Sequence, residues 1–140
     1  MNYACYNSQG EYVVTGTSVE ELSDMEIPVG CSVYYGQADA VSQYHDIANN
    51  VPVDKPARPD YEHKFNYVTK QWELDVAQAI ATALFKREQL LLESDWTDTL
   101  SAQTRLGSAY ESWQTYRQAL RDITDQPQYP ANIVWPTKPH

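Results

Sequence analysis

The sequence has few basic residues, and its first part has none. Residues 1–54 hold eight Asp and Glu residues and no Lys or Arg, so all ten basic residues lie from Lys55 onward, and the net charge is -9. Nucleic-acid binding depends on Lys and Arg displacing counterions from phosphates, so we expect no nucleic-acid partner. The acidity either keeps the protein in solution or attracts a basic partner.

Long apolar runs are also absent. No stretch approaches the ~18 consecutive apolar residues of a membrane span, and the first residues, Met1–Ala4, include neither a charged leader nor an apolar segment of secretory length. These absences predict a soluble cytoplasmic product with no membrane partner. The only cysteines, Cys5 and Cys31, are either small buried hydrophobic residues or a disulfide, and the lack of a leader favours the former.

The residues that catalysis requires are scarce. None of the three histidines has metal-ligand spacing to another histidine or to a cysteine. There is no glycine-rich phosphate loop and no serine in a nucleophile elbow. The adjacent acids Glu20 and Glu21 are typical of a solvated loop, and a glycosidase would need carboxylates that face each other across a gap. We therefore predict a protein that is not an enzyme, without catalytic residues, metal or cofactor.

The first part of the chain is instead rich in short β-prone runs. They alternate with turn residues such as Asn7–Gly10 and Asn49–Asn50, which predicts antiparallel hairpins. The expected strands are 3–6 with 12–15, a further strand at 31–35, then 43–47 with 51–53, and 64–67 with 71–74. No internal repeat is visible.

The second part predicts helices. Asp75 is a plausible N-cap for a helix over 76–92, and a second helix is expected over 101–124 with Gly107 inside it. The run Leu90–Leu92 cannot lie on one face, so this helix either has neighbours on two sides or offers a partner surface. The tail 126–136 contains too many prolines for a helix, yet its apolar side chains must be covered. We expect it to strap across the helices.

The predicted fold class is α+β, with N-terminal antiparallel β hairpins followed by a C-terminal two-helix hairpin and an extended tail rich in Pro and Trp. The step in charge at Lys55 coincides with Pro52, Pro56 and Pro59. We therefore predict an acidic β module at 1–54, a linker and short hairpin at 55–75, and a helical domain at 76–140.

Aromatic residues are abundant, with eleven Tyr, four Trp and two Phe. Such side chains either form the core of a small domain or anchor an interface. The predicted partner-binding residues are Tyr3, Tyr12, Tyr34, Tyr44 and Leu92. Arg117 and Arg121, one helical turn apart, pair either with Asp95, Asp98 or Asp125 within the fold or with carboxylates of a partner.

Three blocks near the C-terminus resemble, in the same order, the tail-assembly-chaperone or tail-fibre-assembly-like proteins of tailed bacteriophages. The blocks are Leu91–Thr97, Trp113–Ile123 and Tyr129–Pro139, within a match over about residues 85–139. The segment 98–112 departs from the proline-containing linker expected there, and it lengthens the predicted second helix. The positions taken as the structural motif are Asp95, Trp96, Trp113, Arg117, Arg121, Trp135 and Pro136.

This resemblance implies a non-catalytic chaperone of tail-fibre assembly. Its partner would be a trimeric tail-fibre or distal-tail protein, to which it either binds transiently in the host cytoplasm or stays attached in the virion tail. The alternative is a structural virion component, such as a fibre-tip or baseplate protein, with weak host-glycan contact through its tyrosines. The resemblance brings no catalytic residue and no cofactor.

Overall fold

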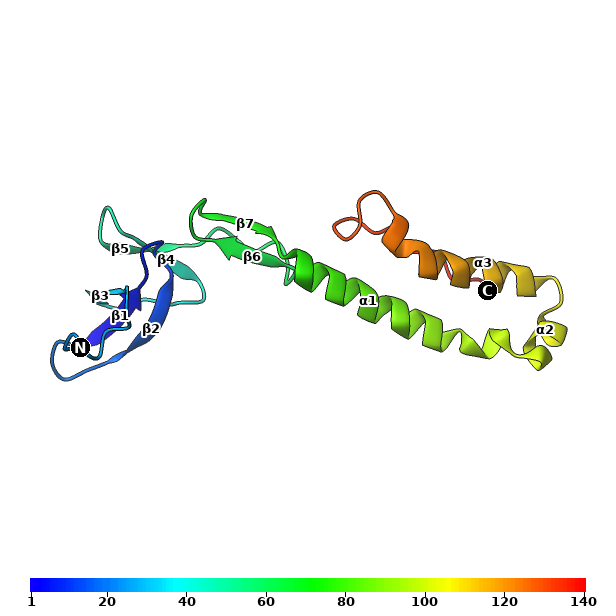
Figure 1. The fold of residues 1–140 in the computed structure, drawn as a ribbon, viewed down its shortest axis with the longest axis horizontal. Helices are drawn as coiled ribbons and strands as arrows, with labels where there is room; N and C mark the ends of the chain where they lie inside the picture. The colour runs from blue at the N-terminus through cyan, green and yellow to red at the C-terminus, as the bar shows by residue number, and fades with distance from the viewer. The chain divides into compact units, whose positions relative to one another are not determined.

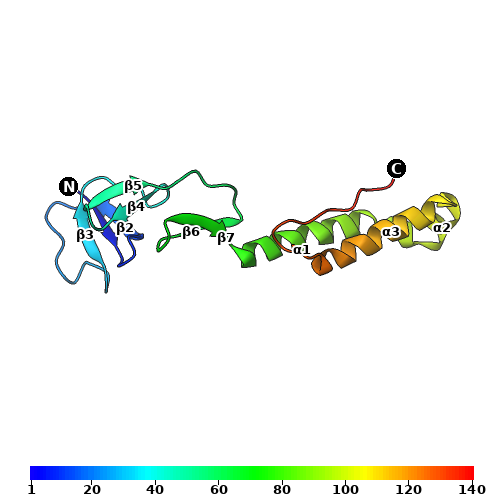
Figure 2. The ribbon, with the colours of Figure 1, turned by 90° about the horizontal axis from the view of Figure 1, so that it is seen from above.

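The computed structural model describes all 140 residues, which form two compact units, Met1–Glu73 and Leu74–His140 (Figures 1 and 2). The α+β class predicted from the sequence is confirmed, because the strands precede the helices along the chain. The separation of 55–75 as a linker with its own hairpin stays a prediction. None of the helices combines the length and apolar character needed to cross a bilayer.

The first three strands form one antiparallel sheet in the order β2-β1-β3. The predicted first hairpin is confirmed, and the predicted third strand pairs with the other side of β1. In the turn, the Asn7 side-chain oxygen accepts hydrogen bonds from the amides of Gln9 and Glu11, and Gly10 has a φ of 83°. The strands are β1 (Asn2–Tyr6), β2 (Tyr12–Thr17) and β3 (Ser32–Tyr35).

Two further hairpins follow, as predicted, and they share one turn geometry. In the first, the Asp46 side chain accepts from the amides of Ala48 and Asn49, and Asn50 has a φ of 55°. Twenty positions later, Asn66 accepts from Val68 and Thr69, and Lys70 has a φ of 58°. The structure thus contains a geometric repeat that the residue identities hide. The strands are β4 (Gln43–Asp46), β5 (Val51–Asp54), β6 (His63–Asn66) and β7 (Gln71–Leu74).

His45 on β4 occupies the core of the first unit. It is fully buried, its ring stacks on Tyr6 with centroids 3.8 Å apart, and Nε2 lies 3.0 Å from Asn50 Oδ1. Because an amide oxygen only accepts, Nε2 carries the proton, and Nδ1 accepts from the Tyr12 hydroxyl at 2.9 Å. Burial lowers the pKa of His45 and raises the pKa of Tyr12 to about 12.

Acidification is therefore expected to destabilise the first unit. The unfolded chain binds a proton at the ordinary histidine pKa of 6.5, whereas folded His45 has a lowered pKa. The neutral, buried His45 therefore contributes its full stabilisation of the fold above pH 6.5. This contribution is lost as the pH falls from 6.5 towards the lowered pKa of the folded state. Urea unfolding between about pH 7.5 and about pH 5.5, followed by the NMR amide signals of β1, measures this. This loss of stability at low pH should persist in His63→Gln and vanish in His45→Gln. If it vanished in His63→Gln instead, His63 and not His45 would be its cause.

The second unit begins with the predicted first helix, α1 (Val76–Glu93). The predicted N-cap is also confirmed, because the Asp75 side chain accepts a hydrogen bond from the Gln78 amide. At the other end, the Ser94 hydroxyl donates to the carbonyls of Leu90 and Leu91. This serine closes the last turn, where carbonyls lack helical partners.

The prediction of one helix over 101–124 is wrong. Gly107 has a φ of 54°, and a residue in this left-handed region ends a right-handed helix. The chain therefore turns at Gly107, and the later helix α3 runs back antiparallel to α1 (Figure 1). After α1 the elements are the 3-10 helix η1 (Asp95–Asp98), α2 (Leu100–Leu106), α3 (Ala109–Arg121) and the 3-10 helix η2 (Asp122–Asp125).

The C-terminal tail packs against the helices, as expected from its apolar residues. The Gln126 side chain donates to the Val134 carbonyl at 2.9 Å and accepts from the Val134 amide at 2.8 Å, which closes a loop. Trp135 then packs on the core cluster of Trp113, Tyr116 and Leu120. The tail is thereby tied to the same core as α3.

Candidate functional site

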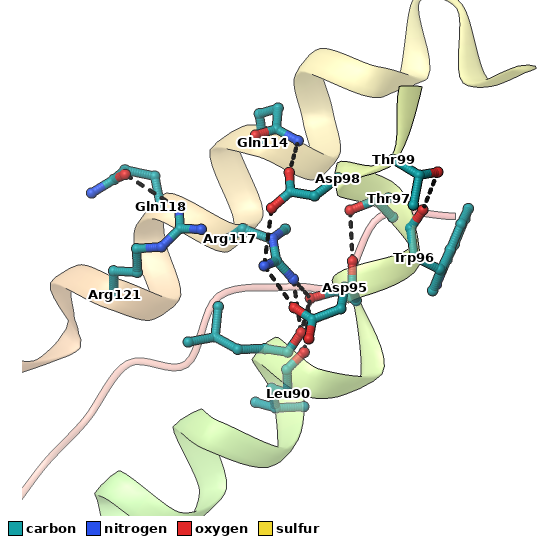
Figure 3. Close-up of polar contacts among 12 residues, drawn as sticks. Leu90, Asp95, Trp96, Thr97, Asp98, Thr99, Gln114, Arg117, Gln118 and Arg121 are labelled. Carbon is teal, nitrogen blue, oxygen red and sulfur yellow. Dashed lines mark hydrogen bonds and ion pairs between the residues drawn. The ribbon is translucent and has the colours of Figure 1, made fainter. Parts of the chain in front are cut away.

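Arg117 links α3 to the end of α1 through a buried guanidinium group. Only 5% of the residue is exposed. Its Nη1 donates to the Leu91 carbonyl and to the Ser94 hydroxyl, both at 2.7 Å. Its Nη2 lies 2.8 Å from Asp95 and 3.1 Å from Asp98 (Figure 3). One side chain thus joins α1, its cap and η1.

The groups around Arg117 fix the chain between α1 and α2. The Gln114 amide donates to Asp98 at 2.8 Å, and the Thr97 hydroxyl donates to the Ser94 carbonyl at 2.7 Å (Figure 3). The Thr99 hydroxyl accepts from the Ala102 amide and caps α2. Because the carboxylates are already paired with Arg117 and Gln114, the cluster is suited to holding a chain reversal.

The second unit also contains a cluster of aromatic rings. Trp113 is buried and lies edge-on to Trp96, with centroids 5.4 Å apart, and to Tyr116, at 5.9 Å. Burial raises the pKa of Tyr116. On the other side, the Lys86 ammonium lies 4.4 Å from the centre of the Trp135 ring, a distance at which cation and ring attract. Three of the four tryptophans therefore belong to one cluster in the second unit.

The sequence of this unit also matches a known family. Residues 80–140 match the sequence model described as phage tail assembly chaperone protein. They belong to the phage tail assembly chaperone family. The resemblance inferred from the sequence blocks is thereby confirmed. No curated protein and no solved structure matches the chain.

The matched range contains every residue of the predicted structural motif. In this chaperone segment, residues 80–140, the two arginines differ in their contacts. Arg117 pairs within the fold, whereas Arg121 is exposed and its one polar contact is with Gln118 at 3.5 Å. Trp135 and Pro136 are half-buried, and Trp96 is 45% exposed. The signal that marked these residues was their order along the chain.

The predicted partner-binding tyrosines are more buried than an interface set would suggest. Tyr12 is 6% exposed and its hydroxyl is bonded to His45, so its side chain lies in the core. Tyr3, Tyr34 and Tyr44 are half-buried, and Tyr44 stacks on Phe65 with centroids 5.8 Å apart. The partner-binding role of these residues stays a prediction.

The exposed apolar side chains lie elsewhere, and sequence reasoning missed most of them. Leu92, which was predicted, is 63% exposed, and Phe85 on the same helix is 68% exposed. On β2, Val13 and Val14 are 50% and 40% exposed. Phe85 precedes Leu92 by seven positions, so helical spacing is the signal that would have found it. Neighbouring valines exposed on one strand are typical of a sheet edge.

Proposed function

We propose that this chain is a chaperone of tail-fibre assembly that binds the β-rich, trimeric fibre or distal-tail protein during assembly in the host cytoplasm. The observation that carries the proposal is the chaperone segment joined to a β unit with an unpaired strand edge. Strand β2 pairs only with β1 in the sheet order β2-β1-β3, and Val13 and Val14 on it are exposed. Main-chain hydrogen bonds at such an edge would capture an extended segment of the fibre.

The charge of the β unit supports a foreign partner over a second copy. Residues 1–54 contain no Lys or Arg, so pairing two copies at β2 brings like charges together. Acidic repulsion of this kind keeps an open edge from pairing with itself. A fibre chain awaiting its trimer partners exposes strand edges that aggregate unless they are held. Holding such an edge requires no catalytic residue.

Edge substitutions test this role. The fibre protein is co-expressed with the chain, and the soluble fibre trimer is measured by gel filtration. We expect Val13→Lys with Val14→Lys to reduce the trimer to the amount formed without the chain, because edge lysines oppose strand addition. The matched control is Met25→Lys with Val29→Lys, which changes two fully exposed residues of the same unit and should preserve the yield. Equal yields with and without the chain would remove the chaperone role.

Purified particles separate a transient chaperone from a permanent component. If the chain acts only during assembly, mass spectrometry of the virion should not find it. Its presence in proportion to the fibre would instead favour a fibre-tip or baseplate protein, and binding of particles to host glycans would then be measured with Tyr3→Ala and Tyr44→Ala variants.

A further inference from the structure

The outer face of α1 carries apolar residues that nothing in the second unit covers. Ala79 and Ala83 are buried, and Leu90 and Leu91 pack on the Trp113 cluster, so they define the covered face. Successive residues turn by about 100° around a helix. Phe85, two positions after Ala83, therefore points away from the core, and this agrees with its 68% exposure.

Several residues share this outer face with Phe85. Leu92 follows it by seven positions and is 63% exposed; residues seven apart lie on one side of a helix. The other members, Gln78, Ala81 and Glu88, are also exposed, and only Glu88 is charged. We call this set the outer stripe: Gln78, Ala81, Phe85, Glu88 and Leu92.

Glu88 gives the outer stripe its charge. It follows Phe85 by three positions and precedes Leu92 by four, so it lies beside both apolar side chains. The two bases of α1 are directed elsewhere, because Lys86 lies over the Trp135 ring and Arg87 is half-buried. A carboxylate is therefore the one charged group of the stripe, and it lies between Phe85 and Leu92.

We propose that the outer stripe binds an amphipathic helix of a partner protein, with a Lys or Arg between apolar residues spaced one heptad apart. Phe85 and Leu92 supply contacts that fit such a helix, and Glu88 selects the base. A second copy fits poorly, because the outer stripe contains no Lys or Arg that could pair with Glu88 of the other copy, and parallel in-register pairing places the two Glu88 carboxylates together. This surface is separate from the β2 edge, so it does not depend on the proposed fibre capture.

Two synthetic helical peptides of about 20 residues serve as probes. Both carry leucines one heptad apart and differ only in having Lys or Glu beside them. Binding to the full chain is measured by fluorescence anisotropy. We expect the Lys peptide to bind at least about tenfold more tightly than the Glu peptide, and Glu88→Lys to reverse this preference. Phe85→Ser with Leu92→Ser should abolish binding of both peptides while circular dichroism stays unchanged.

Charge-matched controls make the outcome decisive. Glu20→Lys with Glu21→Lys changes the net charge of the chain by more than Glu88→Lys does but leaves the outer stripe unchanged. Because the proposal assigns the preference to Glu88, this double variant should leave it intact. If this control weakens the preference as much as Glu88→Lys, the attraction is non-specific and the proposal fails. Sedimentation velocity gives a second test: a dimer of the free chain that Phe85→Ser with Leu92→Ser dissociates would show that a second copy occupies the stripe and would overturn the proposal.

Discussion

Replacing Arg117 with methionine is expected to lower the free energy of unfolding of the second unit by about 3 kcal/mol. Methionine keeps the aliphatic stem but donates no hydrogen bonds. The Leu91 carbonyl and the buried Ser94 hydroxyl would each lose the 2.7 Å bond from Nη1. Asp95 and Asp98 are 58% and 41% exposed in their side chains, so water screens these ion pairs and their loss contributes less. Urea unfolding monitored by tryptophan fluorescence measures the change.

Arg121 provides the matched control on the same helix. It is exposed and has a single 3.5 Å contact with Gln118, so Arg121→Met should change stability by no more than about 0.5 kcal/mol. Arg117→Lys should fall between the two, because one ammonium group cannot reach four acceptors on different elements. If Arg117→Met and Arg121→Met were equally mild, the buried network would not be what holds α3 against α1.

Replacing Gly10 with alanine is expected to destabilise the first unit by about 3 kcal/mol or more, because strain in the left-handed region is combined with a steric clash. An added Cβ would lie 2.3 Å from the His45 carbonyl oxygen, which belongs to the backbone of β4 and cannot rotate away. At the same contact between the two segments, the His45 amide donates a hydrogen bond to the Gly10 carbonyl at 2.8 Å. Relieving the clash would therefore separate the first hairpin from the second.

Gly30 isolates the conformational part of this effect. Its φ is 78°, close to the 83° of Gly10, but a Cβ added at Gly30 would have no atom within 4 Å. Gly30→Ala should therefore cost only about 1–2 kcal/mol, the strain of the left-handed backbone. Urea unfolding followed by the NMR amide signals of β1 and β4 measures both variants. Equal losses would mean that the contact with His45 contributes nothing.

Local patterns in the sequence were sufficient for most of the elements. Aromatic and branched residues around short turns predicted the three hairpins, and Asp75 marked the start of α1. The second helix was placed as one element because helix propensity weakens at a glycine without showing whether the chain turns there. The structure shows that the helix ends there, because Gly107 has a φ of 54°. The chain must reverse between α1 and α3 for the two helices to pack.

The sequence named some residues of the Arg117 and Trp113 clusters, but it missed Ser94, Gln114 and Tyr116 and left the contacts open. The order of the three blocks was enough to select Asp95, Trp113, Arg117 and Trp135, and the pairing of Arg117 with Asp95 and Asp98 was one of two alternatives. Which of the two arginines pairs with these carboxylates depended on burial, because the sequence does not distinguish two arginines one helical turn apart. The burial of Tyr12 around His45 was not foreseen, since it joins strands 33 positions apart.

By itself, the sequence determined the secondary-structure class, the uneven charge and the family of residues 80–140, because each follows from residue types and their local spacing. Only the tertiary structure decided which side chains are covered. It buried Arg117 and Tyr12 and left Phe85, Leu92, Val13 and Val14 in solvent. Burial results from contacts between segments distant in the chain, and these contacts are not encoded in the periodicity of any one segment.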